Sequence, residues 1–192
     1  MLREKLKNHT IILASGSPRR QQFLKDLDID FIINTKPVDE IYPLHLKGAE
    51  ITDFLADLKS KAFTELNDND VLITSDTIVW HKEKALGKPK DRDDAIKMLQ
   101  SLSNKTHEVI TSISIKTKHA QKIINDNTLV TFKKLTDEEI KYYIDIYKPY
   151  DKAGAYGIQE WIGFIGINKI EGSYYNVAGL PVHKLYDELL QF

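Results

Sequence analysis

The sequence predicts an α/β fold, because segments with helical periodicity alternate with strand-like apolar runs along all 192 residues. The connections between these segments are short, and no repeat, low-complexity run or linker interrupts them. The hydrophobic content of 42% is enough to bury a sizeable core. We therefore expect one domain over residues 1–192, which has room for two lobes but not for two independent domains.

The first half of the chain alternates three strands with three helices. Clusters of apolar and β-branched residues predict strands at 11–13, 29–35 and 71–80. Apolar residues that recur every three or four positions predict helices at 18–27, at 49–66 and after Asp91. In the helix at 49–66 the apolar stripe consists of Ile51, Phe54, Leu55, Leu58, Ala62 and Leu66. Lys61 lies at the edge of that stripe, where a lysine can reach into a cleft.

The second half continues the alternation and ends on a helix. Its residue patterns predict strands at 107–116, 128–134 and 162–170. Thr136 and Glu139 form a capping box ahead of an amphipathic helix, which Pro149 prevents from continuing. Small residues at 151–159 predict a loop or a short helix, and Pro181 is placed to begin the final helix.

Charge and cysteine content exclude several classes of protein. Lys and Arg total 27 against 28 Asp and Glu, so the formal net charge of −1 argues against a nucleic-acid or membrane-surface partner. The absence of cysteine excludes disulfides, thiol catalysis and cysteine-bound metals. No stretch resembles a signal peptide or reaches the length of a membrane span. We expect a soluble cytoplasmic protein.

The segment Ser15-Gly16-Ser17-Pro18-Arg19-Arg20 follows the first strand and has the composition of a phosphate-binding loop. Glycine permits a tight turn, Ser17 can cap the next helix, and proline suits the first helical position. The free amides of a helix start attract anions, and two arginines add charged donors. Cations in the first turn are otherwise unfavourable. The alternative is an ordinary capped helix with solvated arginines.

Asp76 is the leading candidate for catalysis, since it interrupts an apolar strand. A carboxylate buried there must be neutral, paired with a cation, or bound to a metal. Near phosphate, Mg²⁺ or Mn²⁺ held by one or two carboxylates would satisfy it, and Glu40, in the loop after the second strand, offers a second carboxylate. The alternatives are a structural Asp paired with a lysine and an acidic loop residue that is simply solvated.

Two further segments carry polar groups of interest. Lys88 lies in the Gly-Pro loop Leu86-Gly87-Lys88-Pro89, which is also consistent with a hairpin-like turn with an exposed lysine. Small residues at 151–159 surround an acid, a lysine and the amide of Gln159, as in a close-fitting pocket wall. The alternative is a tight turn that needs glycine for its backbone.

Taken together, these pieces resemble the Maf family of nucleoside triphosphate pyrophosphatases. The resemblance rests on segments in order along the chain, namely 15–20, 61–62, 75–79, 86–89, 98–103, His107, 151–159 and 179–181. It implies an elongated, twisted mixed sheet flanked by helices, with two lobes around a cleft, of the Maf/ITPase type. It also implies a homodimer and the removal of unwanted nucleotides from the cellular pool.

Within the family, Arg19, Thr77 and Gln159 resemble the branch that hydrolyses dTTP and UTP rather than the branch acting on 7-methyl-GTP. The sequence departs from the common family pattern at Lys148, at Glu160 and at Asn104, and none of these changes removes a catalytic group.

The resemblance assigns a role to each candidate residue. Asp76 would act as general base or hold a divalent metal, Mg²⁺ or Mn²⁺, and Glu40 could complete the metal site. Thr77 and Gln159 would face the base. The residues expected to clamp the triphosphate are Ser15, Arg19, Arg20, Lys61 and Lys88.

Two other functions are weighed against hydrolysis of a pyrimidine nucleoside triphosphate to its monophosphate and pyrophosphate. One is a non-catalytic, nucleotide-binding regulator of cell division, which is disfavoured because the expected catalytic positions are filled. The other is a nucleic-acid binder using Arg19 and Arg20, which is disfavoured by the near-neutral charge.

Overall fold

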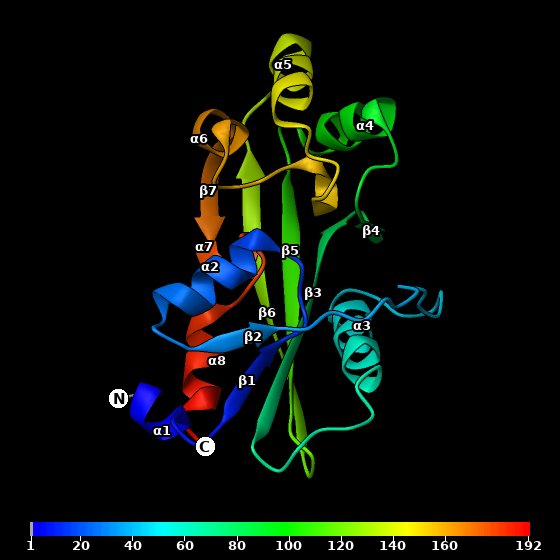
Figure 1. The fold of residues 1–192 in the computed structure, drawn as a ribbon. Coiled ribbons are helices and arrows are strands. Elements are labelled where there is room, and N and C mark those ends of the chain that lie inside the picture. The colour runs from blue at the N-terminus through cyan, green and yellow to red at the C-terminus, as the bar shows by residue number, and fades with distance from the viewer. Residues whose placement is uncertain (1) are drawn as a thin grey trace. The chain divides into compact units, whose positions relative to one another are not determined.

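The structure is a computed structural model that describes residues 2–192 (Figure 1). The chain folds into two compact units. The first unit comprises Met1–Asp76, Thr111–Asp126 and Gly179–Phe192, and the second comprises Thr77–Ile110 and Asn127–Ala178. The three longest strands, β3 (Asp70–His81), β5 (Thr106–Lys116) and β6 (Gln121–Phe132), contribute residues to both units.

The predicted mixed sheet flanked by helices is confirmed. Seven strands form one sheet in the order β2-β1-β3-β5-β6-β7, and β4 (Lys84–Leu86) pairs with β3 off this path. β1 (Thr10–Leu13) runs parallel to both β2 (Phe31–Ile33) and β3. The β3–β4 and β6–β7 pairs are antiparallel, with β7 spanning Ile167–Glu171.

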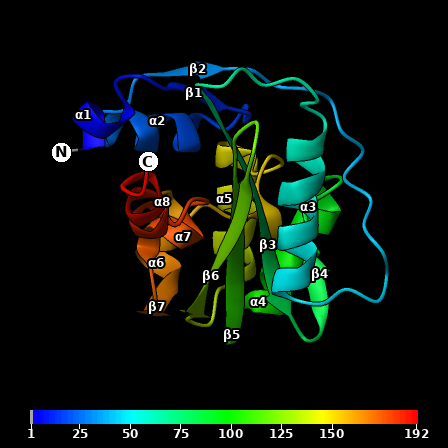
Figure 2. The same cartoon turned by 90° about the horizontal axis from the view of Figure 1, so that it is seen from below.

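In the first unit, helices cover both faces of β1 and of the neighbouring part of β3. Helices α1 (Leu2–Leu6), α2 (Pro18–Asp26) and α8 (Val182–Leu189) lie on one side, and α3 (Ala49–Lys61) lies on the other (Figure 2). Successive strand residues point to opposite faces. Ile11 and Leu13 therefore join the core beneath α1, α2 and α8, whereas Ile12 joins a smaller cluster with Phe63 and Leu72.

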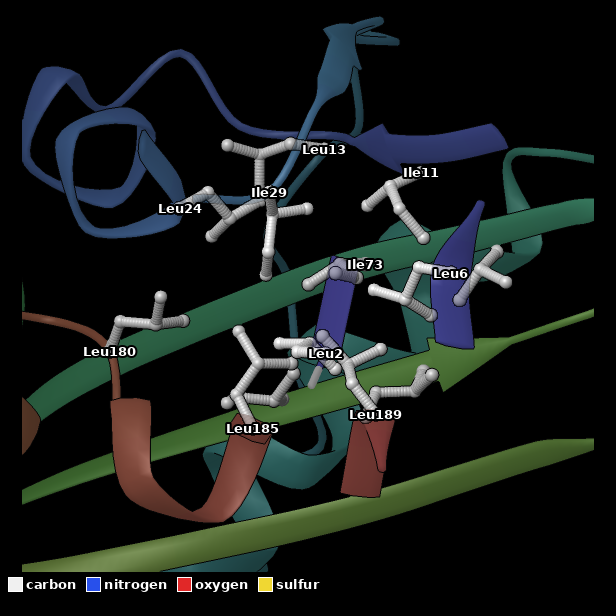
Figure 3. Close-up of a cluster of buried hydrophobic side chains, with 13 residues drawn as sticks. Leu2, Leu6, Ile11, Leu13, Leu24, Ile29, Ile73, Leu180, Leu185 and Leu189 are labelled. Atoms are coloured by element: carbon white, nitrogen blue, oxygen red, sulfur yellow. The ribbon is translucent and has the colours of Figure 1, made fainter. Parts of the chain in front are cut away.

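The larger core cluster fixes the position of the loop that follows β1. Leu24 of α2 and Leu185 and Leu189 of α8 are fully buried in the same cluster as Leu13 (Figure 3). In the parallel β1–β3 pair, Leu13 lies opposite Ile73, and the next amide, that of Ala14, donates to the Ile73 carbonyl at 2.9 Å. The carboxyl end of β1 therefore lies beside the stretch of β3 that contains Asp76.

The second unit contains helices α4 (Arg92–Leu102), α5 (Asp137–Tyr147), α6 (Trp161–Gly166) and α7 (Tyr174–Val177), with a single 3₁₀ turn, η1 (Ala153–Ala155). The capping box is confirmed: Thr136 accepts from the Glu139 amide and Glu139 from that of Thr136. Asn104 and Lys148 adopt positive φ angles of 56° and 48°, which asparagine tolerates better than lysine.

The prediction of a strand over 162–170 is wrong in its first half. Residues Trp161–Gly166 form α6, and only the part from Ile167 onward pairs with β6. A short apolar run does not by itself distinguish a buried helix from a strand. The structure also shortens the predicted strand at 29–35, ends α3 at Lys61, and extends β6 back to Gln121. Among the described residues, no helix is long and apolar enough to cross a membrane.

Candidate active site

The loop between β1 and α2 is held by its own side chains. The Ser15 hydroxyl oxygen accepts a hydrogen bond from the Ser17 amide at 3.2 Å and another from an Arg20 nitrogen at 3.4 Å. Pro18 is the first helical residue and Ser17 is the N-cap residue, as predicted, but the Ser17 side chain makes no capping hydrogen bond within the described chain. A Cβ placed on Gly16 would meet nothing within 4 Å, so the loop is open at this point. A ligand can approach the backbone there.

The Arg20 guanidinium donates hydrogen bonds to backbone carbonyls. Its Nε donates to the Gly179 carbonyl at 2.8 Å and its Nη1 to the Ser75 carbonyl at 2.9 Å. Burial lowers the pKa of Arg20 to about 10, against the attraction of Asp76, and the guanidinium is still charged at neutral pH. Arg20 therefore ties α2 to β3 and to the start of the C-terminal segment. The charge of Arg19 lowers the pKa of Arg20 further, which places a second cation in the same field.

Asp76 lies at the centre of a charged cluster within the first unit. Its Oδ1 is 2.6 Å from the Lys59 Nζ, and the same nitrogen is 3.0 Å from the Glu40 Oε1. The side chain of Asp76 is 9% exposed, and that of Glu40 is 46% exposed. Burial raises the pKa of Asp76 above its usual value, although the Lys59 ammonium and the Arg20 guanidinium oppose this shift. The cationic neighbours thus offset only part of the desolvation penalty of the carboxylate.

Lys59, which sequence reasoning missed, takes the position expected for Lys61. The Lys61 Nζ pairs instead with Asp57 at 2.6 Å, and the Lys61 side chain is 67% exposed. The two lysines are two positions apart on α3, so they point in directions that differ by about 200°. The structure therefore does not bring Lys61 to Asp76, and a phosphate contact by Lys61 stays a prediction.

The buried face of α3 explains why the sequence does not single out Lys59. The structure buries Ile51, Thr52, Leu55, Ala56 and Ser60, a stripe that includes two polar residues and leaves Phe54 and Leu58 only partly buried. Lys59 follows Leu55 by four positions and Ala56 by three, so it extends this face. Treating Thr52 and Ser60 as interior residues would identify Lys59 rather than Lys61.

The donor set fits a hard divalent cation only in part. Asp76 and Glu40 supply two carboxylates that converge on one point, the Lys59 ammonium. No group of three or more His, Cys, Asp or Glu side chains within residues 2–192 could hold a metal ion. A cation here would take its remaining oxygen ligands from water and substrate, as Mg²⁺ commonly does.

In the second unit, the segment 151–159 packs tightly through Gly154. Its φ is +68°, and a Cβ there would lie 2.7 Å from the Val79 side chain. The Gly154 amide also donates to the Gly87 carbonyl at 3.0 Å, which fixes the loop that carries Lys88. Lys88 itself is exposed and has no hydrogen-bond or ion-pair partner among the described residues.

Gln159 presents an unused acceptor. Its Oε1 is buried and has no hydrogen-bond partner among the described residues. The neighbouring Glu160 pairs at 3.1 Å with Lys152, which also pairs with Asp151 at 2.7 Å, and Glu160 accepts a hydrogen bond from the Tyr143 hydroxyl. Glu160, a departure from the family pattern, is therefore occupied within the protein. Thr77, which follows Asp76 in β3, is partly buried.

Comparisons with known proteins identify the family of this chain. The family described as "Maf: Maf-like protein" matches residues 10–192. A dTTP/UTP pyrophosphatase of Flavobacterium johnsoniae is 64% identical over 190 residues, covering 98% of each chain. One from Flavobacterium psychrophilum is 63% identical over 191 residues, covering 99% of this chain and 98% of the relative. One from Bacteroides fragilis is 52% identical, covering 97% of each chain.

Solved structures support the fold. The Ham1 protein of Staphylococcus aureus has a TM-score of 0.52 at 15% identity, covering 95% of this chain and 98% of its own. The HAM1 protein of Coxiella burnetii has a TM-score of 0.53 at 15% identity, covering 96% and 100%. Such likeness shows the fold alone. The match of the family over residues 10–192, together with a relative that is 64% identical over 190 residues, shows that this chain belongs to the Maf family.

Proposed function

We propose that this protein hydrolyses dTTP and UTP to the nucleoside monophosphate and pyrophosphate with the help of Mg²⁺ or Mn²⁺. The observation that carries the proposal is the buried Asp76 carboxylate, paired with Lys59 and in the field of Arg20, beside a loop that is open at Gly16. Relatives named dTTP/UTP pyrophosphatase support the choice of pyrimidine nucleotides. The proposal extends to removal of unwanted nucleotides from the cell, a cytoplasmic location and a homodimer.

In the proposed reaction a water oxygen bonds to the α-phosphorus, and the bond from that phosphorus to the pyrophosphate oxygen breaks. Asp76 either takes the water proton or, together with Glu40, holds the divalent cation. That cation would supply charge neutralisation on the phosphate oxygens. Lys59 and Arg20 place positive charge beside Asp76, and this charge favours negative charge that develops on the phosphoryl group.

The chain offers several groups for the phosphates and the base. Ser15, Arg19 and the open backbone at Gly16 lie at the helix start, where an anion is favoured. Arg20 supports this loop through its bonds to two carbonyls, and its contact with the triphosphate stays a prediction. Lys88 has free donors for a phosphate, and the unpaired acceptor of Gln159 suits the N3–H of uracil or thymine, with Thr77 beside the base.

Pyrophosphate release by the purified full chain tests the proposal. With Mg²⁺ or Mn²⁺ present, dTTP and UTP should be hydrolysed faster than dATP, dGTP and 7-methyl-GTP. Fastest turnover of 7-methyl-GTP would contradict the assigned branch. Binding of nucleotides with no release of pyrophosphate from any of them would favour a non-catalytic regulator instead.

Arg19→Ala is expected to lower kcat/KM by about ten- to hundredfold for every nucleoside triphosphate tested, because one charge-assisted phosphate contact is worth roughly 1.5–3 kcal/mol. Lys88→Ala should act in the same way. Phosphate contacts carry no information about the base, so the losses should be uniform across substrates. Steady-state kinetics on dTTP, UTP and dATP provide the measurement, and unchanged kcat/KM would remove both residues from the site.

Gln159→Ala is expected to reduce the preference for pyrimidines more than it reduces total activity. A buried amide that pairs with the correct base is left unsatisfied by the wrong one, at a cost of roughly 1–3 kcal/mol. Without that amide, purine nucleotides should gain relative to dTTP. The ratio of kcat/KM for dTTP and dATP measures this change. An equal loss on all bases would show that Gln159 does not read the base.

A further inference from the structure

Lys59 makes an unusual set of contacts for a lysine in a nucleotide-binding site. Its ammonium lies 2.6 Å from Asp76, 3.0 Å from Glu40 and 3.5 Å from the Ser75 carbonyl. An ammonium has three protons to donate, and three oxygens lie within 3.5 Å of the Lys59 nitrogen. Lys59 therefore lies where two carboxylates and a carbonyl converge, and its closest partners are carboxylates of the protein.

The carboxylates of this cluster already have cationic neighbours. Asp76 and Glu40 contribute two negative charges, and Lys59 and Arg20 contribute two positive ones, with Arg19 in the same field. A divalent cation between the two carboxylates would neutralise them by itself. It would leave the charges of Lys59 and Arg20 uncompensated, which is the arrangement that a bound triphosphate requires.

We propose that in the ligand-free protein the Lys59 ammonium occupies the position between Asp76 and Glu40 that a divalent cation would take. When cation and nucleotide bind, the Lys59 side chain moves and its ammonium pairs with a phosphate oxygen instead. The inference rests on the proposed function for the identity of the nucleotide. In the absence of substrate, the Lys59 ammonium replaces the metal between the two carboxylates and so lowers the affinity of the site for the metal.

Lys59 and Glu40 are more exposed than Asp76, which favours an exchange of partners. Lys59 has a flexible four-carbon stem and is 18% exposed, so its head can leave the carboxylates without opening the core. Glu40 lies between β2 and α3 in a segment with neither helix nor strand, and it forms an ion pair with Lys59. Asp76, by contrast, is fixed within β3.

Coupled binding follows from this exchange. A cation that binds without nucleotide must displace the Lys59 ammonium from Asp76 and Glu40. The ammonium then has no carboxylate partner and lies close to the positive charge of the cation, which is unfavourable. A nucleotide offers the ammonium new partners, so each ligand should strengthen the binding of the other by the same factor. A lysine that only braced Asp76 would instead stabilise the site, and its removal would weaken the binding of both ligands.

The test measures Mn²⁺ affinity of the full-length protein without nucleotide, by calorimetry and by the electron paramagnetic resonance of free Mn²⁺. Lys59→Gln is expected to bind Mn²⁺ at least about tenfold more tightly than the wild type, since the competing charge is gone. Lys61→Gln is the matched control, with the same charge change on the same helix. Its Mn²⁺ affinity should stay within about twofold of wild type, because its exposed ion pair is only weakly coupled to the site.

Two further measurements complete the test. A non-hydrolysable dTTP analogue should tighten Mn²⁺ binding of the wild type much more than that of Lys59→Gln. The double variant Lys59→Gln, Asp76→Asn should lose the increase in Mn²⁺ affinity expected for Lys59→Gln. That loss would assign the increase to the cluster around Asp76. Lys59→Met, checked by circular dichroism, replaces the Gln variant if that one fails to fold.

Equal or weaker Mn²⁺ binding by both Lys59 variants overturns the proposal. These affinities are measured without turnover, so they test the role of Lys59 separately from the proposed pyrophosphatase activity. If the wild type releases no pyrophosphate but Lys59→Gln still gains affinity, the proposed function fails and the role of Lys59 stands.

Discussion

Replacing Asp76 by Asn is expected to abolish pyrophosphate release and, at the same time, to raise the melting temperature of the metal-free protein. The amide has nearly the shape of the carboxylate but cannot accept a proton from water or hold a cation with charge. The loss should appear in kcat, by on the order of a thousandfold or more, since the substrate still meets the same phosphate contacts.

The stability gain follows from the pKa of Asp76. Burial raises this pKa in the folded protein, so the folded state binds the proton more tightly than the unfolded state does. The contribution of Asp76 to the free energy of unfolding is then greatest at low pH and is lost as the pH rises through its folded pKa. Asn cannot ionise, so the variant should avoid this loss, and its advantage over wild type should grow between acidic and neutral pH.

Asp68→Asn serves as the control for this prediction. Asp68 is 73% exposed and pairs with Lys118 at 2.7 Å, and that contact lowers its pKa. Its removal should leave activity unchanged and should not raise the melting temperature at any pH. Calorimetric melting in the presence of a chelator, from acidic to neutral pH, compares the two variants. Wild-type turnover in Asp76→Asn would remove Asp76 from the chemistry, and a fall in its melting temperature would assign it a structural role.

The parts of this fold that the sequence predicts well are those set by neighbours in the chain. The Thr136 and Glu139 capping box is complete in a four-residue pattern, and Asp91 and Pro18 begin their helices as expected. Asp76 stands out because a carboxylate inside an apolar run needs a partner wherever it folds. The α/β character of the fold likewise follows from alternation and connection length.

What the sequence does not reveal depends on tertiary packing. The choice between Lys59 and Lys61 turns on which face of α3 is buried, and that face includes Thr52 and Ser60, whose hydroxyls bond to carbonyls of α3 itself. Such local bonds allow polar residues to be buried on a helix. Likewise, Gly166 packs against Phe132 and Leu135, and this contact is invisible in the run at 162–170.

The hydrogen bonds from Arg20 to the backbone are a third feature that depends on tertiary packing. Adjacent arginines look equivalent in the sequence, which predicts that both clamp phosphate. Helical geometry turns successive side chains about 100° apart, so only one can face β3. The structure gives that position to Arg20, which bonds to the carbonyls of Ser75 and Gly179.

Arg20→Ala is therefore expected to destabilise the protein by on the order of 3 kcal/mol, in contrast to Arg19→Ala, which should change stability by less than about 0.5 kcal/mol. Its removal leaves two carbonyls and the Ser15 hydroxyl without the donor that they share, next to the buried Asp76. For a chain of this size the loss corresponds to a fall of roughly 6–12 °C in melting temperature.

Arg20→Lys distinguishes geometry from charge. Lysine keeps the positive charge near Asp76 but cannot direct two planar N–H groups at carbonyls that lie on separate segments. We expect it to recover less than half of the lost stability, and the phosphate loop should lose order in both variants. Urea unfolding of wild type, Arg19→Ala, Arg20→Ala and Arg20→Lys measures these differences. If Arg20→Lys is as stable as the wild type, charge alone holds the loop; if Arg20→Ala is also unaffected while its use of all nucleotides falls, Arg20 is a phosphate ligand after all.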